Sequence, residues 1–309
     1  MDLKERARAA FPSIYGRLGA FKRALDLRTR REARARLDEA IRANDLFPAQ
    51  HHRRPHGLHT PLVVSLTSYS KRFETLERTI KSLIDQSVRP DHLVLWLGER
   101  DLPLLPPGVR ALEGHGLEIR ESQDSRSATK LLPSLEAFPE ATVVTADDDL
   151  YYEPQWLERL VEASRNSPGD IIGYRAHMAQ VDAQGTPTPY RYWEFETQAL
   201  ADPGAGSALF LTGVAGVLYP PHSLHPDVLD RELYLELCPR ADDIWFFAMA
   251  LKQGTRRRRL DHRLHIIEWP SSQDNSLNSH NYHDDGNDVQ FAALLRRYPE
   301  VATLMGGRA

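Results

Sequence analysis

An alternation of apolar, strand-like segments with an amphipathic, helix-like segment most constrains the fold of this chain. LVVSLTSY at residues 62–69 is rich in β-forming residues, ETLERTIKSLIDQ at 74–86 has helical periodicity, and HLVLWLG at 92–98 is apolar again. Short apolar runs bounded by turn residues are typical of buried strands. A strand, a helix and a second strand at this spacing predict a βαβ unit with parallel strands.

The alternation continues and ends in three consecutive aspartates. LEIRES at 117–122 predicts a strand, SATKLLPSLEAF at 127–138 a short helix, and ATVVTA at 141–146 a strand that runs into Asp-Asp-Asp. We expect the next helix from Pro154 to about Ser164, because proline suits the first helical position.

The second half is less regular but keeps both kinds of element. We expect strands at 170–177, 210–221 and 262–269, and a helix at 242–254 that Gly254 closes. The chain is therefore expected to have an α/β fold with a mixed, mainly parallel sheet flanked by helices.

The segment before residue 61 predicts a helical extension of a different character. Apolar residues at spacings of three and four form one face of a helix, and arginine and lysine occupy its other faces. A second helical stretch covers about 29–44, and Pro48 and Pro55 end the pattern. We therefore expect a basic amphipathic extension at 1–60 and one catalytic domain at 61–309. The apolar face consists of Phe11, Ile14, Leu18, Phe21 and Leu25.

Charge separates the two regions in the same way. Residues 1–60 hold 14 of the 39 Lys and Arg but only 7 of the 43 Asp and Glu, which leaves 25 against 36 for the rest. The basic helix fits an anionic membrane surface, or alternatively packing against the catalytic domain or a partner subunit. We expect no nucleic-acid partner.

The cellular location is expected to be cytoplasmic. There is no apolar core of a signal peptide, no run of about 18 apolar residues that could span a bilayer, and a single cysteine, Cys238, which forms no internal disulfide. If the basic helix binds lipid, the protein would lie at the inner face of the cytoplasmic membrane.

The aspartate triplet Asp147, Asp148 and Asp149 is the first candidate site. Ligands of open α/β sheets bind outside the carboxyl ends of the strands, which is where the triplet falls. Three adjacent carboxylates repel one another, and Mg²⁺ or Mn²⁺ would remove that repulsion. The alternative is a solvated acidic turn before the following helix.

Two further groups of charged residues could complete such a site. Arg126 and Lys130, one helical turn apart, are candidate contacts for the phosphates or base of a nucleotide, or else solvated surface charges. Asp242 and Asp243 open a predicted helix, where one of them could act as an N-cap. The alternative is that Asp243 is a general base and Asp242 contacts the acceptor or sugar.

Several motifs in a fixed order resemble a known group of enzymes. VSLTSYSKR, SLIDQSVRPDHLVLWLG, TADDDLYY followed by WLERL, FLTGVAGVLYPP and ADDIWF are similar to bacterial GT-A glycosyltransferases of polysaccharide and lipopolysaccharide assembly, which are DxD-containing and family-2-like. The resemblance covers roughly residues 61–290 and implies the Rossmann-like, nucleotide-sugar-binding GT-A fold.

The resemblance also implies roles for individual residues. It places Asp147 near the ribose and the metal, Asp149 on the metal with help from Asp148, and the base of an inverting reaction at the acidic pair, with Asp243 as that base. Thr212 and Gly213 would line the donor-sugar pocket. The residues flanking the nucleotide base would be Thr67, Ser68, Tyr69 and Arg72.

A histidine from the C-terminal segment completes the metal shell in some members of the GT-A fold. His283 is the expected ligand here, with His280 as the alternative, and each could instead be an ordinary histidine of a solvated loop.

The function expected from the sequence is metal-dependent, hexosyltransferase-type sugar transfer with inversion, using Mn²⁺ or Mg²⁺. The donor would be a nucleotide-diphosphate sugar, expected to be a UDP-sugar, and the acceptor a hydroxyl of a glycan or lipid-linked oligosaccharide.

Two alternatives remain open at this stage. One is a nucleotidyl or sugar-phosphate transferase, although the glycine-rich loop with a following lysine is missing. The other is a non-catalytic carbohydrate-binding protein with Tyr190, Tyr192 and Trp193 stacking on sugars. The arginine run 256–259 could bind acceptor phosphates or form a solvated face.

Overall fold

The computed structural model describes residues 12–49, 53–202, 207–262, 265–270 and 286–306. The chain divides into two compact units, Met1–Leu46 and Phe47–Ala309. The first unit contains the helix α2, Pro12–Asp45, which is one continuous helix where the sequence suggested two stretches. Its expected apolar face, from Phe11 to Leu25, lies outside the described side chains. No helix among the described residues is both long and apolar enough to cross a membrane.

The compact units divide at residues 46 and 47, earlier than the boundary near residue 60 that the sequence suggested. The linker-like segment belongs with the second unit because its β1, Arg54–Pro55, pairs with β3, Val88–Arg89. The assignment of one helical extension and one catalytic domain stays a prediction.

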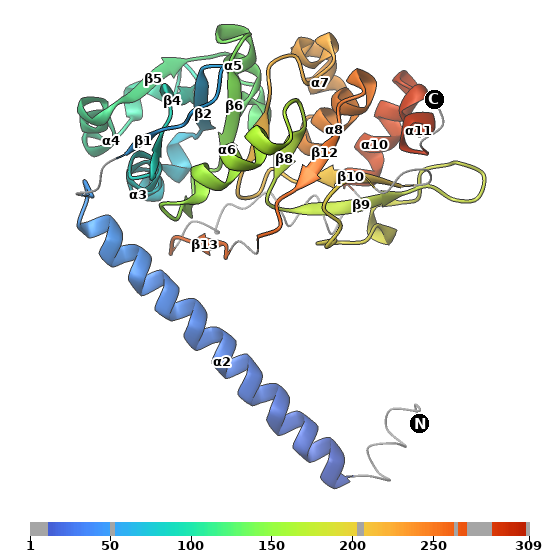
Figure 1. The fold of residues 1–309 in the computed structure, drawn as a ribbon, viewed down its shortest axis with the longest axis horizontal. Coiled ribbons are helices and arrows are strands. Elements are labelled where there is room, and N and C mark those ends of the chain that lie inside the picture. Colours follow the sequence, from blue (N-terminus) through green and yellow to red (C-terminus); the bar gives the residue numbers. More distant parts are fainter. Residues whose placement is uncertain (1–11, 50–52, 203–206, 263–264, 271–285, 307–309) are drawn as a thin grey trace. The chain divides into compact units, whose positions relative to one another are not determined.

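The second unit is built on a seven-stranded sheet with the order β12-β8-β11-β6-β2-β4-β5 (Figure 1). β2 pairs in parallel with β4 and β6, β4 with β5, and β8 with β12. Only β11 runs antiparallel to its neighbours in this sheet, β6 and β8. The mixed, mainly parallel α/β fold is thus confirmed. The strands are β2 Leu62–Thr67, β4 His92–Leu97, β5 Leu117–Glu121, β6 Thr142–Ala146, β8 Ile171–Gly173, β11 Val217–Tyr219 and β12 Arg257–Arg259.

Both faces of this sheet are covered, because alternate strand residues enter two separate apolar cores. In β2, Val63 belongs to one core, whereas Val64 and Leu66 belong to the other. The helices α3, Phe73–Ile84, and α6, Trp156–Asn166, pack into the core of Val64 and Leu66. The helices on the opposite face are α5 Leu132–Ala137, α7 Arg231–Leu237, α8 Asp242–Gln253, α10 Gly286–Arg297 and α11 Glu300–Met305.

Several expected elements are shorter or divided in the structure. The strand expected at 170–177 is divided into β8 and β9, Ala176–Gln180, and the one at 210–221 into β10, Ser207–Leu211, and β11. β9 and β10 form a separate antiparallel pair. The helix expected at 127–138 is divided into the 3-10 turn η4, Arg126–Lys130, and α5.

The remaining short elements lie around this framework. The strand expected at 262–269 is reduced to β13, which pairs antiparallel with β7 directly after the aspartate triplet. The helix α4 precedes β5 in the chain, and five further 3-10 turns fall in the described loops. The bounds of the strands, the helix and the 3-10 turns named in this paragraph are β7 Leu150–Tyr151, β13 Ile267–Glu268, α4 Pro107–Ala111, η1 Ser70–Arg72, η2 Leu102–Leu104, η3 Leu112–His115, η5 Tyr190–Tyr192 and η6 Pro226–Leu229.

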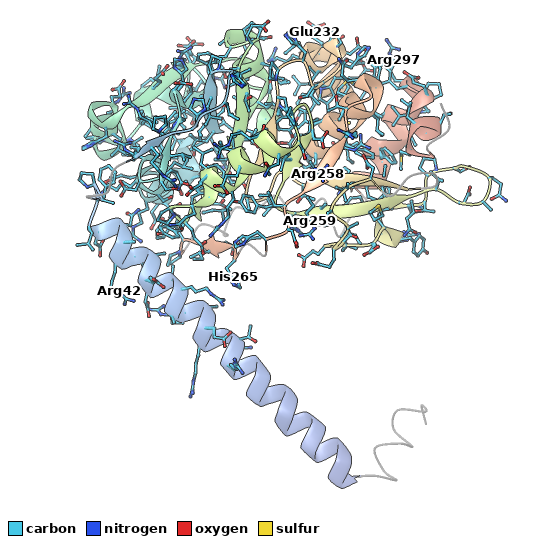
Figure 2. The ribbon with its side chains drawn as sticks, in the orientation of Figure 1. Arg42, Glu232, Arg258, Arg259, His265 and Arg297 are labelled. Atoms are coloured by element: carbon cyan, nitrogen blue, oxygen red, sulfur yellow. The ribbon has the colours of Figure 1, made fainter. Side chains whose placement is uncertain are left out.

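The arginine run 256–259 is only partly a solvated face, because Arg257–Arg259 form the edge strand β12 (Figure 2) whereas the Arg256 side chain is 75% exposed. Binding of acceptor phosphates by this run stays a prediction. The side chains of Arg256 and Arg258 lie 3.0 and 3.1 Å from the carboxylate of Asp170, which is buried. Arg257 is also buried and pairs with Asp202 at 2.8 Å. A strand whose charges are all held by protein partners has no signature in apolar periodicity, which is why the sequence did not reveal it.

The aromatic residues proposed for sugar stacking are mostly packing residues. Trp193 is only 3% exposed and lies with Tyr190 among the aromatic rings of the core. Tyr192 alone is exposed, and its ring is covered by the guanidinium of Arg191.

We expect Gly216→Ala to destabilise the fold strongly. Gly216 has φ +101°, and an added Cβ would lie 2.7 Å from Trp156 and 2.8 Å from the carbonyl oxygen of Thr145. The free energy of unfolding, measured with urea, should fall by about 2 kcal/mol or more. Gly114→Ala is the matched control, because its Cβ would meet nothing within 4 Å. Equal stability of the two variants would contradict the conclusion that the backbone conformation and close contacts of Gly216 require a glycine.

Candidate active site

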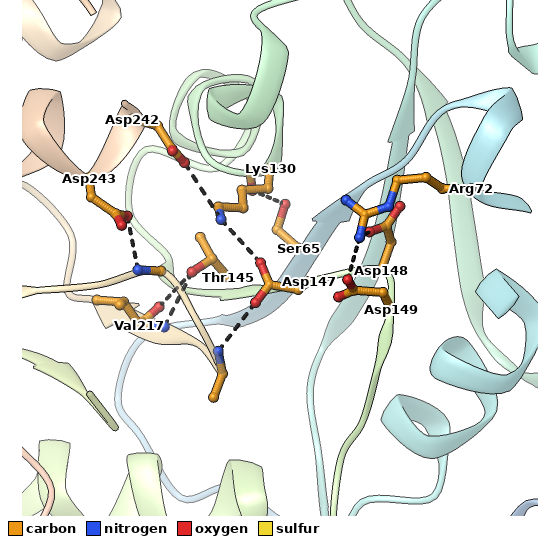
Figure 3. Close-up of polar contacts among 12 residues, drawn as sticks. Ser65, Arg72, Lys130, Thr145, Asp147, Asp148, Asp149, Val217, Asp242 and Asp243 are labelled. Carbon is orange, nitrogen blue, oxygen red and sulfur yellow. Dashed lines mark hydrogen bonds and ion pairs between the residues drawn. The ribbon is translucent and has the colours of Figure 1, made fainter. Parts of the chain in front are cut away.

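The candidate site lies where parallel strands β2 and β6 end. Leu66 pairs with Ala146, so the residues that follow each strand lie side by side. Ser68 Oγ donates a 2.5 Å hydrogen bond to Asp148 Oδ2 across this edge. From the other side, the loop that precedes the antiparallel strand β11 reaches the same edge (Figure 3). The sheet topology therefore gathers residues that are far apart in the sequence.

Asp147 is held by contacts from both sides of the site. Its Oδ1 lies 3.3 Å from Lys130 Nζ, and its Oδ2 accepts a 3.2 Å hydrogen bond from the backbone N–H of Ala215. Its own backbone N–H donates to the hydroxyl of Tyr152 at 2.7 Å. The carboxylate is thus fixed in orientation.

Lys130 connects the two acidic groups that the sequence singled out. Its Nζ lies 3.3 Å from Asp147 and 3.5 Å from Asp242 Oδ2 (Figure 3). Burial lowers the pKa of Lys130, but Asp147, Asp242 and Asp243 together raise it well above its ordinary value. The ammonium group therefore stays charged at neutral pH.

A chain of hydrogen bonds fixes the backbone beneath Lys130. Its carbonyl oxygen accepts a 2.6 Å bond from Ser65 Oγ, which accepts a 2.8 Å bond from Ser134 Oγ. Ser134 in turn accepts from Trp96 Nε1 at 2.8 Å. Sequence reasoning missed this chain, although a serine inside the apolar strand LVVSLT was a signal that a buried polar contact is present.

The acidic pair lies in the first turn of α8. Asp243 Oδ1 accepts a 2.9 Å hydrogen bond from the backbone N–H of Gly213, whereas Asp242 Oδ2 is buried without a hydrogen-bond partner. Burial, and then the neighbouring Asp242, raises the pKa of Asp243 to about 7. A Cβ at Gly213 would lie 2.9 Å from Lys130 Nζ and 3.0 Å from Asp243 Oδ1, so a larger residue here would displace the Lys130 ammonium group or the Asp243 carboxylate. A carboxyl group with this pKa can take up or release a proton near neutral pH.

Arg72 is the second cation of the site. Its guanidinium lies 3.3 Å from Asp148 Oδ1 and donates a hydrogen bond to Asp149 Oδ2 (Figure 3). Asp148 is only 4% exposed, and burial raises its pKa to about 6 although Arg72 and Ser68 act in the opposite direction. The backbone carbonyl of Asp149 accepts a 3.1 Å hydrogen bond from the backbone N–H of Trp269.

The other expected site residues have different surroundings. Thr67 Oγ1 donates to the carbonyl of Trp96 at 2.9 Å, and Tyr69 is 38% exposed. The side chain of Arg126 is exposed and lies 3.9 Å from Asp124, so the structure does not bring it to Lys130. Thr212 is buried, and its hydroxyl has no hydrogen-bond partner. His280 and His283 lie outside the described residues.

The site has a deficit of positive charge. Five aspartates face two cations, Lys130 and Arg72, and two of the aspartates, Asp148 and Asp243, have raised pKa values as a consequence of burial. An oxygen-only donor set of this kind fits Mg²⁺ or Mn²⁺. Among the residues that the structure describes, no three His, Cys, Asp or Glu side chains are grouped closely enough to hold a metal ion.

Comparisons with known proteins give similarity of fold only. No protein-family model and no curated protein matches this sequence. The solved structures that resemble it include the mannosyltransferase PcManGT from Pyrobaculum calidifontis in complex with GDP-Man and Mn²⁺, with 13% identity, a TM-score of 0.49, and coverage of 92% of this chain and 79% of that one. S. aureus TarS 1-349 has 13% identity and a TM-score of 0.47 over 79% of this chain and 70% of that one.

A third similar structure is an enzyme of another type. A CMP:2-keto-3-deoxy-manno-octonic acid synthetase in complex with CTP has 12% identity and a TM-score of 0.42, covering 72% of this chain and 99% of that one. At such values no ligand and no residue role carries over, so the function has to be inferred from the side chains of this site.

We expect Lys130→Met to destabilise the protein by about 3 to 5 kcal/mol, because it leaves buried carboxylates without their counter-charge. Urea unfolding at pH 7.5 would measure this loss. Adding Asp147→Asn to Lys130→Met should restore part of the stability, whereas Lys71→Met, at an exposed lysine nearby, should have little effect. A stability of Lys130→Met equal to that of Lys71→Met would show that the ion pairs contribute nothing.

Proposed function

We propose that this protein is a metal-dependent glycosyltransferase that moves a sugar from a nucleotide-diphosphate donor to an acceptor hydroxyl with inversion. The observation that carries the proposal is the position of Lys130 between Asp147, at the end of β6, and Asp242, at the start of α8. This contact joins a site suited to a metal and diphosphate to a site suited to an acceptor.

The acidic triplet provides the donor side. Asp149 and Asp147 would hold Mn²⁺ or Mg²⁺, with His283 as a further ligand from the C-terminal segment. The metal, when bound, neutralises negative charge on the departing diphosphate. The charge deficit of the site supports this role, because a divalent cation compensates carboxylates that two basic side chains leave uncompensated. Arg72 would contact the nucleotide, together with Thr67, Ser68 and Tyr69.

The acidic pair provides the acceptor side. Asp243 would take the proton of the acceptor hydroxyl as its oxygen forms a bond to the anomeric carbon. The bond from that carbon to the diphosphate oxygen breaks, and the diphosphate leaves with the electron pair. The Gly213 N–H, which donates to Asp243, orients the carboxylate for this step. Asp242 would position the acceptor or sugar.

The expected partners follow from these roles. They are a nucleotide sugar, for which the sequence resemblance implies UDP, and a glycan or lipid-linked oligosaccharide. Contact of the basic helix with an anionic membrane stays a prediction from the sequence, as does the role in bacterial polysaccharide or lipopolysaccharide assembly.

We expect transfer or slow donor hydrolysis to require Mn²⁺ or Mg²⁺ and to be lost in EDTA. Asp243→Asn should lower kcat by a factor on the order of 10² to 10⁴, because it removes the base. Asp149→Asn should weaken Mn²⁺-dependent binding of the donor. Asp45→Asn, an exposed aspartate of the other unit, is the matched control. A screen of nucleotide sugars with product analysis would measure all of these effects.

The products distinguish this function from the alternatives. Free nucleoside diphosphate indicates sugar transfer, whereas pyrophosphate or nucleoside monophosphate indicates nucleotidyl or sugar-phosphate transfer. Full activity in EDTA, or in both aspartate variants, would disprove the proposal. Glycan binding without metal-dependent donor binding would instead support a carbohydrate-binding protein.

The rate should also depend on pH through Asp243. The base acts in its deprotonated form, so a pKa of about 7 predicts that kcat/KM falls as pH decreases below this value, about tenfold per unit once the pH is well below it. Above pH 8 this limb should be flat. A pH profile without an ionisation between pH 6 and 8 would show that Asp243 is not the base.

A further inference from the structure

Arg175 and Thr212 each have a buried polar atom that the proposed function does not use, although the Arg175 side chain as a whole is 30% exposed. Arg175 Nε is buried without a hydrogen bond, and so is Thr212 Oγ1. Thr212 itself is only 4% exposed. Unpartnered polar atoms are rare in folded proteins, and two adjacent ones indicate a place where a ligand supplies the missing partner.

The β9–β10 pairing puts the two residues opposite each other. The register pairs Ala176 with Leu211 and His177 with Phe210, and the backbone N–H of Thr212 donates to the carbonyl of Arg175 at 3.1 Å. Residues directly opposite in an antiparallel pair point to the same face. Arg175 and Thr212 therefore share the face that carries His177 and Phe210.

That face points toward α8. The Phe210 ring lies 5.1 Å from the ring of Phe247, and Asp243 is one turn before Phe247 on the same side of the helix. Phe210 thus lies next to Phe247, and Thr212, two residues later in the chain, lies closer to Asp243, one turn earlier in α8. The next residue, Gly213, donates its N–H to Asp243 at 2.9 Å, which places the backbone of Thr212 beside the proposed base, with Arg175 opposite it on the neighbouring strand.

The charge around Arg175 is only weakly compensated. Its described ion pair is with Glu196, at 3.4 Å from Nε, and the Glu196 side chain is 70% exposed. Burial first, and the positive charge of Arg175 next, lower the pKa of the neighbouring His177 to about 4. A guanidinium beside a hydroxyl donor is suited to a planar or tetrahedral oxyanion.

We propose that Arg175 and Thr212 form a subsite for a carboxylate or phosphate group on the acceptor, next to the hydroxyl that Asp243 deprotonates. This inference rests on the proposed function and specifies it: the acceptor is an acidic or phosphorylated sugar rather than a neutral one. Glu196 closes the subsite at its exposed rim and competes with the acceptor for the guanidinium.

The test compares three probes by calorimetric or NMR titration: methyl glucuronide, glucose 6-phosphate and the neutral methyl glucoside. Wild-type protein should bind at least one charged probe more tightly than the neutral one. Arg175→Gln should weaken that binding about tenfold, and Thr212→Val should weaken it less, as expected for the loss of a charged and a neutral hydrogen bond. The charged probe that binds identifies the group as carboxylate or phosphate.

Two further variants keep the result interpretable. Arg191→Gln, at an exposed arginine that covers Tyr192, is the matched control and should bind as wild type does. Glu196→Gln should tighten binding of the charged probe, and this exposed change tests the proposal even if Arg175→Gln fails to fold. Equal binding of charged and neutral probes, or no effect of both Arg175→Gln and Glu196→Gln, would overturn it.

The failure of this inference can be separated from failure of the proposed function. Mn²⁺-dependent binding of nucleotide sugar, measured by thermal stabilisation, should be the same in wild type and Arg175→Gln. If donor binding persists and the preference for charged probes is absent, only the acceptor subsite is disproved. If wild-type protein binds no nucleotide sugar with metal, the proposed function itself fails.

Discussion

The buried ammonium group of Lys130 is the interaction on which the site depends. It lies between carboxylates from two parts of the chain that are more than ninety residues apart, and it is held from below by a chain of buried serine hydroxyls. Without a cation at this point, the partly buried Asp147 and the buried Asp242 would lie in this site without a counter-charge, which is unfavourable. The lysine therefore holds together the end of β6 and the start of α8, and with them the two acidic groups of the candidate site.

Arg72 compensates the negative charge of Asp148 and Asp149, as Lys130 compensates that of Asp147 and Asp242, but the two cations differ in surroundings. Lys130 is enclosed by three aspartates and a glycine backbone, whereas Arg72 lies at the end of a 3-10 turn next to an exposed tyrosine. A guanidinium can exchange one oxyanion for another without losing its charge. The position of Arg72 suits a side chain that contacts carboxylates when no ligand is bound and phosphate oxygens when a ligand is bound.

Much of the fold could be predicted from periodicity, because buried parallel strands and amphipathic helices leave clear patterns. LVVSLT, HLVLWL and TVVTA became strands at almost their expected bounds, and the position of Asp147 after a buried strand could be inferred directly. The arginine strand β12 and the division of the segment 170–177 could not be predicted from periodicity. Contacts with residues far away in the sequence determine both. For the site, the sequence allowed prediction of the charged residues that take part and of the strands that they follow. The bridging role of Lys130, the Ala215 contact and the separation of Arg126 required three-dimensional pairing.

The reversed strand β11 has a consequence for how the protein is made. The contacts that complete the site, Ala215 with Asp147 and Gly213 with Asp243, come from the loop before this strand, and Asp242 lies still later in the chain. A nascent chain that has emerged only as far as Asp149 therefore has its acidic triplet but none of these partners. Contacts of such long sequence separation form late and slowly. The chain would thus complete its candidate site near the end of synthesis, and the first half-domain alone would be an incomplete sheet prone to association.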